Sequence, residues 1–126
     1  LHERNLLVTE ATFSLVSKDK TLIQKQIAEN LKWRNEKQPQ LDEFPSCGSV
    51  FKKIEGIGAG RLIDKVGLKG RSIGGAQISN KHANYIVNLG NAKAQDVIQL
   101  IQLIQSKVKS QLGYNLETEI SFVGEF

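Results

Sequence analysis

Two segments of this 126-residue chain carry apolar side chains at helical spacing, and the first of them lies near the N-terminus. Between Leu22 and Leu31 the apolar side chains recur three or four positions apart, which is typical of one face of an α-helix. Asp19 is a residue type that caps helix N-termini, and Pro39 disfavours helical backbone in the residue before it. The pattern therefore predicts a helix over residues 20–38.

The second helical stripe is longer and more regular than the first. Its apolar positions follow the i, i+3, i+4, i+7 pattern and comprise Val97, Leu100, Ile101, Ile104, Val108 and Leu112. Asn91 is expected to cap the N-terminus of this helix, and Gly113 is a natural residue to end it. We expect this helix to be part of the scaffold.

Shorter segments predict strands and one short helix. Arg71–Ile78, interrupted by Gly74-Gly75, fits a strand with a bulge or a site where another group approaches closely. Asn84–Leu89 fits a second strand, Leu116–Val123 alternates between apolar and polar positions, and Arg61–Val66 fits a short helix. Without a regular βαβ repeat, these elements indicate the α+β class, with a small sheet of short strands packed against two main helices.

The segment Ser46–Lys53 combines small hydroxyl residues, a thiol and one glycine before it becomes apolar and basic. Gly48 allows a backbone conformation that other residues avoid, or a close approach to a ligand. Ser49 would then present a hydroxyl group that can donate or accept a hydrogen bond. Eight of the eleven glycines of the chain lie between Gly48 and Gly75, so we expect the functional site to be organised around this segment.

Positive charge is concentrated in the same part of the chain. Between Phe51 and Lys81 there are seven Lys or Arg residues against Glu55 and Asp64, and this surplus of five exceeds the net charge of +4 of the whole chain. Glycine-rich backbone N–H groups and lysine ammonium groups together favour an anion site. A loop-rich surface with solvated lysines is the alternative explanation of the same composition.

Composition and spacing argue against several other classes of protein. The Gly56-x-Gly58-x-Gly60 spacing lacks the βαβ context of a dinucleotide-binding fold and the Gly-Lys-Ser/Thr ending of a P-loop. No apolar run is long enough to cross a bilayer, so no membrane partner is expected. An isoelectric point of 9.3 suggests a small basic nucleic-acid-binding module as an alternative, but the few aromatic residues do not alternate with the basic ones, and no nucleic-acid partner is expected.

The single cysteine excludes an internal disulfide and fits a reducing compartment, so we expect a cytoplasmic location. Cys47 is expected to be a small buried residue, because no base lies near it in the sequence. No metal site is expected. The chain contains no methionine, which indicates a piece of a longer protein.

A further pattern is carried by six short segments, namely Pro45–Lys52, Gly58–Asp64, Gly67–Gly70, Ile73–Ala76, Lys81–Asn88 and Glu119–Gly124. In this order they resemble the C-terminal part of the UDP-N-acetylenolpyruvoylglucosamine reductase family, the MurB flavoenzymes of bacterial cell-wall synthesis. The resemblance covers nearly the whole chain.

The resemblance implies a reaction. Members of this family reduce FAD with NADPH, and the reduced flavin passes a hydride to the enolpyruvyl ether of UDP-N-acetylglucosamine, which gives UDP-N-acetylmuramate. The implied cofactors are FAD and NADPH, and the implied partner is UDP-N-acetylglucosamine enolpyruvate. Such an oxidoreductase serves peptidoglycan synthesis and, through it, cell shape and cell division. The resemblance does not imply an oligomeric state.

Particular residues receive roles from the same resemblance. Ser49 matches the proton donor of the family, and Glu119 matches the glutamate that assists at the charged intermediate, so both should line one cleft. The implied substrate-binding residues are Gly48, Lys52, Lys53, Lys81 and His82. For His82, a role as a surface or capping residue remains the alternative.

The resemblance further implies two domains. Residues 1–17, which contain the β-branched and aromatic segment Leu6–Leu15, would be the closing strand of an upstream FAD-binding domain, and residues 18–126 would be the C-terminal substrate-binding domain. Three positions depart from the family pattern. Lys53 stands where asparagine is common, so the polar contact that this asparagine makes in the family is not carried over. Ser121 stands where many members carry arginine, and Cys47 where alanine is frequent.

Overall fold

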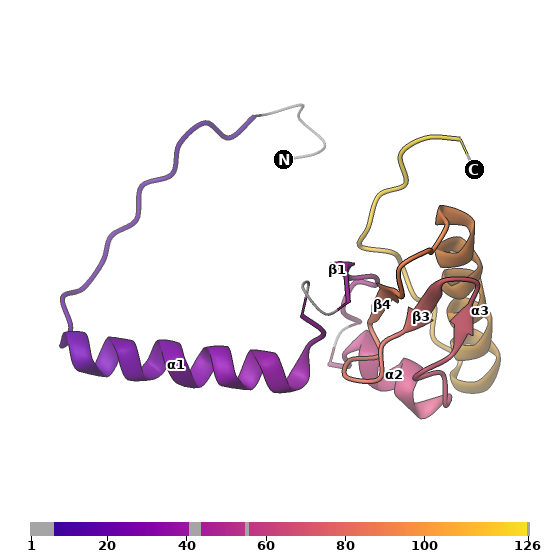
Figure 1. The fold of residues 1–126 in the computed structure, drawn as a ribbon, viewed down its shortest axis with the longest axis horizontal. Coiled ribbons are helices and arrows are strands. Elements are labelled where there is room, and N and C mark those ends of the chain that lie inside the picture. The colour runs from indigo at the N-terminus through magenta and orange to yellow at the C-terminus, as the bar shows by residue number, and fades with distance from the viewer. Residues whose placement is uncertain (1–6, 41–43, 55, 126) are drawn as a thin grey trace. The chain divides into compact units, whose positions relative to one another are not determined.

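The computed structural model describes residues 7–40, 44–54 and 56–125 (Figure 1). The chain forms two compact units, Leu1–Leu31 and Lys32–Phe126. The predicted α+β class is confirmed by three helices and a four-stranded antiparallel sheet in the described residues. No helix among these residues has the length and apolarity that crossing a membrane requires.

The N-terminal region differs from the prediction. Residues 7–19 form neither helix nor strand and are exposed, so the strand predicted over Leu6–Leu15 is wrong for residues 7–15, and residue 6 lies outside the described residues. A β-branched sequence needs a neighbouring strand for its backbone hydrogen bonds, and no strand of the described residues pairs with this one.

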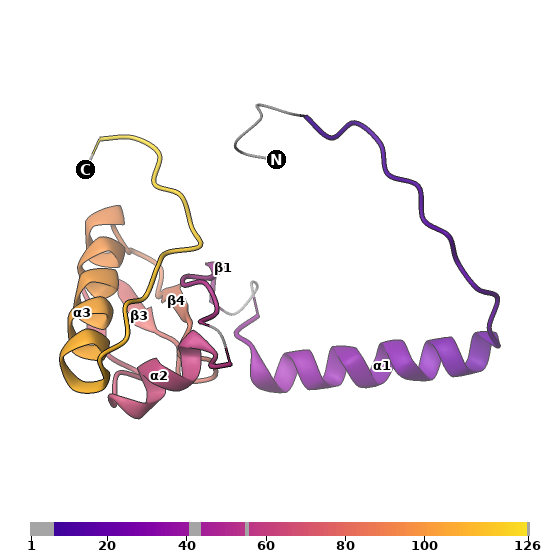
Figure 2. The same cartoon turned by 180° about the vertical axis from the view of Figure 1, so that it is seen from behind.

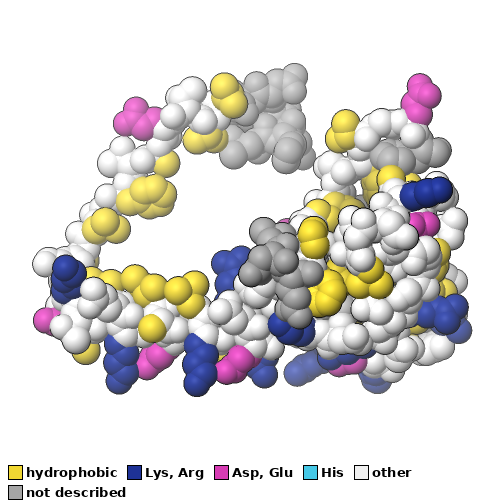
Figure 3. Space-filling view, in the orientation of Figure 1, with side chains coloured by type: hydrophobic (Ala, Val, Ile, Leu, Met, Phe, Trp, Pro, Cys, Tyr) yellow, Lys and Arg dark blue, Asp and Glu magenta, His cyan; other side chains and the backbone are white. Residues whose placement is uncertain are grey.

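The first helix, α1, spans Lys20–Lys37, close to the predicted bounds. The Asp19 carboxylate caps it as expected, because Oδ1 accepts hydrogen bonds from the backbone N–H groups of Thr21 at 2.9 Å and Leu22 at 3.0 Å. Apolar side chains follow one face of α1 and charged side chains the other (Figure 3), yet no residue of the helix is buried. In this chain, therefore, α1 does not contribute to a core.

The sheet has the strand order β1-β4-β3-β2, with every neighbouring pair antiparallel. Its strands are β1 (Ser46–Ser49), β2 (Ser72–Ile73), β3 (Ala76–Ile78) and β4 (Tyr85–Asn88). The single strand predicted over residues 71–78 is wrong, because Gly74-Gly75 turn the chain and make β2 and β3 a hairpin. The strand predicted over residues 84–89 is confirmed as β4.

The close approach expected at the glycine pair is present. A Cβ atom on Gly75 would collide with the backbone of Asn91 and Ala92, and one on Gly74 would collide with the Asp96 carboxylate. The hairpin turn therefore lies directly against the start of the last helix. The Gly75 N–H donates to Asp96 Oδ2 at 3.2 Å and fixes this contact.

The last helix, α3, spans Ala94–Leu112 and packs against β2 and β3 (Figures 1 and 2). The predicted stripe is confirmed, since Leu100, Ile101, Ile104 and Val108 are buried, and the helix ends at Gly113 with φ 79°. The predicted cap is wrong: the N-cap is Lys93, not Asn91. The Lys93 N–H donates to Asp96 Oδ2 at 2.9 Å, so the carboxylate at the third helical position satisfies the helix start.

The short helix α2 spans Ala59–Lys65, two residues earlier at its start than predicted, and contacts α3. Its buried side chains join the core with residues from β3, β4, α3 and the segment after β1; the largest fully buried ones are Phe51, Ile63, Ile78, Leu100, Ile104, Val50 and Val108. The strand predicted over residues 116–123 is reduced to one bridge between Phe51 and Thr118. Leu116 is buried there and Glu117 is exposed, as the alternation predicted.

Candidate functional site

A cavity of about 470 Å³ lies where the segment after β1 meets the start of α2 and the C-terminal segment. It is lined by Ser49, Phe51, Lys52, Lys53, Gly58, Ala59, Gly60, His82, Asn84 and Glu119. Ser49 and Glu119, which are 70 positions apart in the sequence, thus lie on the wall of one cavity. A hydroxyl, a carboxylate, an imidazole and two ammonium groups on one wall are a suitable set for proton transfer beside an anionic ligand.

Ser49 is the last residue of β1, opposite Tyr85 in β4. The strand register shifts between Ser46 and Ser49, at the point where Gly48 has φ 84°. Other residues rarely adopt this backbone angle, so the expected special conformation at Gly48 is confirmed. The Ser49 side chain is half-buried, and among the described residues no side-chain hydrogen bond holds its hydroxyl group.

The backbone after Ser49 is held on two sides. On one side, the Val50 N–H donates to the Asn84 carbonyl at 2.9 Å. The Phe51 N–H donates to Asn84 Oδ1 at 3.0 Å, and Asn84 Nδ2 donates to the Phe51 carbonyl at 2.9 Å. Asn84 is buried and therefore acts as a short substitute for a neighbouring strand.

On the other side lies the segment that carries Glu119. The Glu119 N–H donates to the Val50 carbonyl at 2.8 Å, and the Lys52 N–H donates to the Glu117 carbonyl at 2.9 Å. The same three residues, 50–52, thus connect the Ser49 strand to the Glu119 segment through backbone hydrogen bonds. The Glu119 side chain is exposed.

Two lysines line the cavity. The Lys52 ammonium lies 3.1 Å from the Glu117 carboxylate, but these side chains are 59% and 77% exposed, so solvent screens the pair and leaves Lys52 available to a ligand. Lys53 is exposed on the same wall. Within residues 7–40, 44–54 and 56–125 no group of three or more His, Cys, Asp or Glu side chains could hold a metal ion.

His82 lies between this cavity and a second one. Its Nδ1 accepts the Asn84 N–H at 3.2 Å, and its ring makes an edge contact with Tyr85 at a centroid distance of 5.0 Å. Burial, and to a smaller extent the charge of Lys69, holds the pKa of His82 below its ordinary value of 6.5. The ring is therefore neutral at pH 7, and because Nδ1 accepts, Nε2 carries the proton and can donate.

The second cavity, of about 270 Å³, shares Gly58, Gly60 and His82 with the first. Its other lining residues are Arg61, Asp64, Lys69, Lys81 and Ala83. Lys69 forms an ion pair with Asp64 at 3.0 Å, so one of the positive charges of this wall is compensated. Positive side chains from α2 and from the loop before β4 nevertheless extend the basic surface beyond the first cavity.

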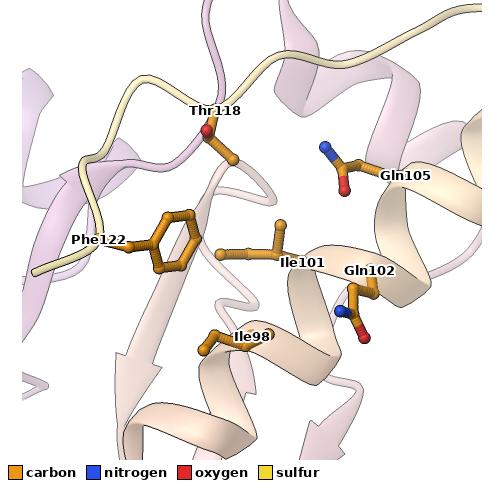
Figure 4. A pocket seen from close by; sticks show the side chains of 6 residues that line it. All are labelled: Ile98, Ile101, Gln102, Gln105, Thr118 and Phe122. Atoms are coloured by element: carbon orange, nitrogen blue, oxygen red, sulfur yellow. The ribbon is translucent and has the colours of Figure 1, made fainter. Parts of the chain in front are cut away.

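The C-terminal segment is also held from the side of α3. A cavity of about 320 Å³ lies there, lined by Ile98, Ile101, Gln102, Gln105, Thr118 and Phe122 (Figure 4). Gln105 Nε2 donates to the Leu116 carbonyl at 2.9 Å. None of the described residues that line this cavity is titratable, and Gln105 anchors the segment that carries Glu119.

Comparison with known proteins identifies the family. The family described as "UDP-N-acetylenolpyruvoylglucosamine reductase, C-terminal domain" matches residues 38–123. The chain belongs to this family. Residues 38–123 include all of the sheet, α2, α3 and both cavities that His82 lines.

Individual reductases are similar over nearly the whole chain. The UDP-N-acetylenolpyruvoylglucosamine reductase of Listeria welshimeri is 50% identical over 123 residues, which are 98% of this chain and 41% of the relative. That of Clostridium botulinum is 43% identical over 125 residues, 99% of this chain and 40% of the relative. The chain thus spans about two fifths of the length of the curated relatives that it matches.

A solved structure shows the same fold. The crystal structure of the reductase from Thermus caldophilus is 41% identical, with a TM-score of 0.69. The similarity covers 86% of this chain and 37% of that chain. The α+β unit described above is therefore an established part of reductase architecture.

Most of the site residues that the family resemblance implied line one of two neighbouring cavities. Five of them line the first cavity, namely Ser49, Lys52, Lys53, His82 and Glu119. Lys81 lines the neighbouring cavity, whereas the lining of neither cavity includes Gly48. Cys47 is exposed, so the expectation that it is buried was wrong: it lies on β1, an edge strand of the sheet, which no further strand of the described residues covers.

Asn84 and Phe51 line the first cavity, as do Gly58, Ala59 and Gly60, and sequence reasoning named none of these five as site residues. The four hydrogen-bonding groups of Asn84 and Phe51 meet across 33 positions, which no local spacing reveals. For Asn84, the only available signal was an asparagine at the first position of a predicted strand, and this residue type is common in turns for reasons unrelated to a site.

Proposed function

We propose that this chain is the substrate-binding part of an NADPH- and FAD-dependent UDP-N-acetylenolpyruvoylglucosamine reductase, which makes UDP-N-acetylmuramate for peptidoglycan in the cytoplasm. The observation that supports this most is the shared cavity of Ser49 and Glu119. The names of the relatives agree with it. By contrast, neither name points to a nucleic-acid-binding module.

Ser49 would supply the proton. Addition of hydride to one alkene carbon of the enolpyruvyl ether breaks the π bond and places the electron pair beside the carboxylate. The adjacent carbon then takes the proton of the Ser49 hydroxyl group, and solvent returns a proton to the serine. An unperturbed serine is a poor acid, so the positive charge of Lys52 and Lys53 on the same wall would favour the serine anion.

Glu119 and His82 would assist at the same carbon atoms. Glu119 comes from the segment that hydrogen-bonds Val50, the residue after Ser49, so its carboxyl group would meet the same part of the substrate. Neutral His82 would donate from Nε2 to a substrate oxygen. Lys81 and the second basic cavity would attract the charged remainder of the sugar nucleotide.

The cavity fits the substrate end of this reaction. Its polar groups suit a carboxylate and a developing anion, and it is bordered by glycines where a ligand can approach the backbone. FAD, reduced by NADPH, would supply the hydride from a separate part of the enzyme that corresponds to the rest of the relatives' length.

Residues 1–17 would belong to the FAD-binding domain, and α1 would be the part of the substrate-binding domain that contacts it. Five large apolar side chains of α1 are 41–59% exposed, namely Leu22, Ile23, Ile27, Leu31 and Trp33. Residues 7–16 expose further apolar side chains. Such surface is costly unless it is covered, so we propose that it packs against the FAD-binding domain.

A chimera tests the proposed function. This chain would replace the matching 41% of the Listeria welshimeri reductase, and both half-reactions would be followed by flavin absorbance. We expect the chimera to reduce the sugar, and Ser49→Ala to abolish this step while NADPH still reduces the flavin. Ser110→Ala, which changes an exposed serine on α3, is the matched control and should leave both steps intact. Loss of both steps in Ser49→Ala would mean that the serine is structural.

A further inference from the structure

Residues 50–52, which follow Ser49, are held by Asn84 on one side and by the segment 117–119 on the other. Five backbone groups of residues 50–52 form hydrogen bonds across the loop, and Asn84 supplies the partner for three of them. The segment 117–119 supplies the other two. Because β1 ends at Ser49, Asn84 supplies hydrogen-bond partners to the next two residues, which no longer belong to the sheet.

Asn84 is itself fixed before any ligand binds. Its side chain is buried, and its N–H donates to His82 Nδ1. The preceding turn is closed by the Ser79 hydroxyl, which accepts the N–H groups of Lys81 at 3.1 Å and His82 at 3.3 Å. The carboxamide is therefore a preorganised part of the cavity wall and not a mobile surface group.

We propose that Asn84 is a positioning residue, whose carboxamide sets the distance between the Ser49 hydroxyl and the Glu119 segment. The catalytic consequence of this inference, but not its structural part, rests on the proposed function. The carboxamide aligns the Phe51 backbone, Val50 accepts the Glu119 N–H through its carbonyl, and Ser49 directly precedes Val50. Displacement of Phe51 would hence move the proton donor and the assisting carboxylate apart. Misplacement by about 1 Å can slow a reaction about 100-fold.

The two hydrogen bonds that the Asn84 carboxamide forms with Phe51 can be removed separately. Asn84→Asp keeps an acceptor for the Phe51 N–H but loses the donor to the Phe51 carbonyl, and it places two oxygen atoms against each other. Asn84→Ala loses both hydrogen bonds. Asn88→Ala is the matched control, because Asn88 also holds backbone N–H groups, those of Gly90 and Ala92, but lies outside both cavities.

The first experiment uses the chimera with the Listeria welshimeri reductase. We expect Asn84→Ala to slow sugar reduction about 10- to 100-fold. Asn84→Asp should slow it as well, while flavin reduction by NADPH stays within about twofold of the parent in both variants. Asn88→Ala should change neither step. Equal rates of sugar reduction in Asn84→Ala and Asn88→Ala would overturn the proposal.

The second experiment uses this chain alone and does not depend on the proposed function. Amide hydrogen exchange would be measured at Val50, Phe51 and Lys52 in the parent, Asn84→Ala and Asn88→Ala. We expect faster exchange at Phe51, relative to the other two positions, only in the Asn84 variant, because the Phe51 N–H loses its acceptor there. If the parent chimera fails to reduce the sugar, the proposed function fails, and this measurement still decides the positioning role. Unchanged protection of Phe51 in Asn84→Ala would overturn that role.

Discussion

The carboxamide of Asn84 and the backbone of Phe51 form a reciprocal pair of hydrogen bonds, at 3.0 and 2.9 Å, in the interior of the domain. Two neighbouring strands exchange hydrogen bonds in the same way, but here one partner is a side chain. Because Phe51 is 1% exposed, water cannot replace this partner. The pair therefore contributes to stability as well as to the geometry of the cavity.

Asn84→Ala should lower the free energy of unfolding of this chain. The N–H and carbonyl groups of Phe51 would be left buried without partners, which costs about 2–4 kcal/mol in total. Urea unfolding followed by circular dichroism would measure the difference. Asn88→Ala should cost less, because its partners Gly90 and Ala92 lie nearer to solvent. A loss no larger than that of Asn88→Ala would contradict the prediction.

Gly75→Ala should also destabilise the chain, for a steric reason. The new methyl group would meet the backbone of Asn91 and Ala92, which cannot rotate away, and such overpacking costs about 1–3 kcal/mol. Gly58→Ala is the control, because Gly58 has nothing within 4 Å of the corresponding position and a φ of −73°. Thermal unfolding of both variants would show whether only Gly75→Ala lowers the midpoint.

Stability should fall on acidification in a way that depends on His82. The folded pKa of His82 is lower than its ordinary value of 6.5, so the unfolded chain binds the proton more strongly. The resulting stability is complete above pH 6.5 and is lost as the pH falls through the folded pKa. His82→Gln, which keeps an acceptor for the Asn84 N–H, should show a weaker pH dependence of the unfolding midpoint between about pH 7.5 and 5. An unchanged slope would assign the dependence to other groups.

Substitution on the apolar face of α1 should have no effect on this chain alone. Ile27 is 52% exposed, so Ile27→Gln should change the free energy of unfolding by less than about 0.5 kcal/mol. Ile104→Ala, in contrast, empties a fully buried position of α3 and should cost about 2–5 kcal/mol. In the chimera, by contrast, we expect Ile27→Gln to lower the free energy of unfolding, because the proposed contact with the FAD-binding domain would be lost. Equal stability of the parent chimera and the Ile27→Gln chimera would argue against that contact.

Binding of a sugar nucleotide should depend on salt. Lys52 and Lys53 are exposed, and at physiological ionic strength the charge of such groups is screened within about 8–10 Å. Titration of this chain with UDP-N-acetylglucosamine should give weak binding that weakens further at high salt. Uridine, which lacks the diphosphate, should show no such trend. Salt-independent binding, or tighter binding of random oligonucleotides, would favour the nucleic-acid alternative.

The sequence predicted those features that depend on neighbours along the chain. The stripe of α3, the Asp19 cap, the special backbone at Gly48 and the end at Gly113 all follow from residue type and local spacing. These features are decided within one or two turns of backbone, where side-chain preference and hydrogen bonding act together.

The features that could not be predicted depend on partners elsewhere. The segment 7–15 has strand propensity but no neighbouring strand among the described residues. The N-cap of α3 is Lys93 and not the predicted Asn91, because the Asp96 carboxylate accepts hydrogen bonds from the N–H groups of both Lys93 and Gly75. For the cavity, residue types indicated Ser49 and Glu119 only through family resemblance, and nothing local indicated Asn84.

The hydrogen bond from Glu119 to Val50 also has a consequence for biosynthesis. Glu119 is synthesised 70 residues after Ser49, after the sheet, α2 and α3. Leu116, in the same late segment, belongs to the buried core. The core and the cavity wall are therefore completed by the same segment, so a translation product that ends before it would lack a core residue as well as the Glu119 carboxylate.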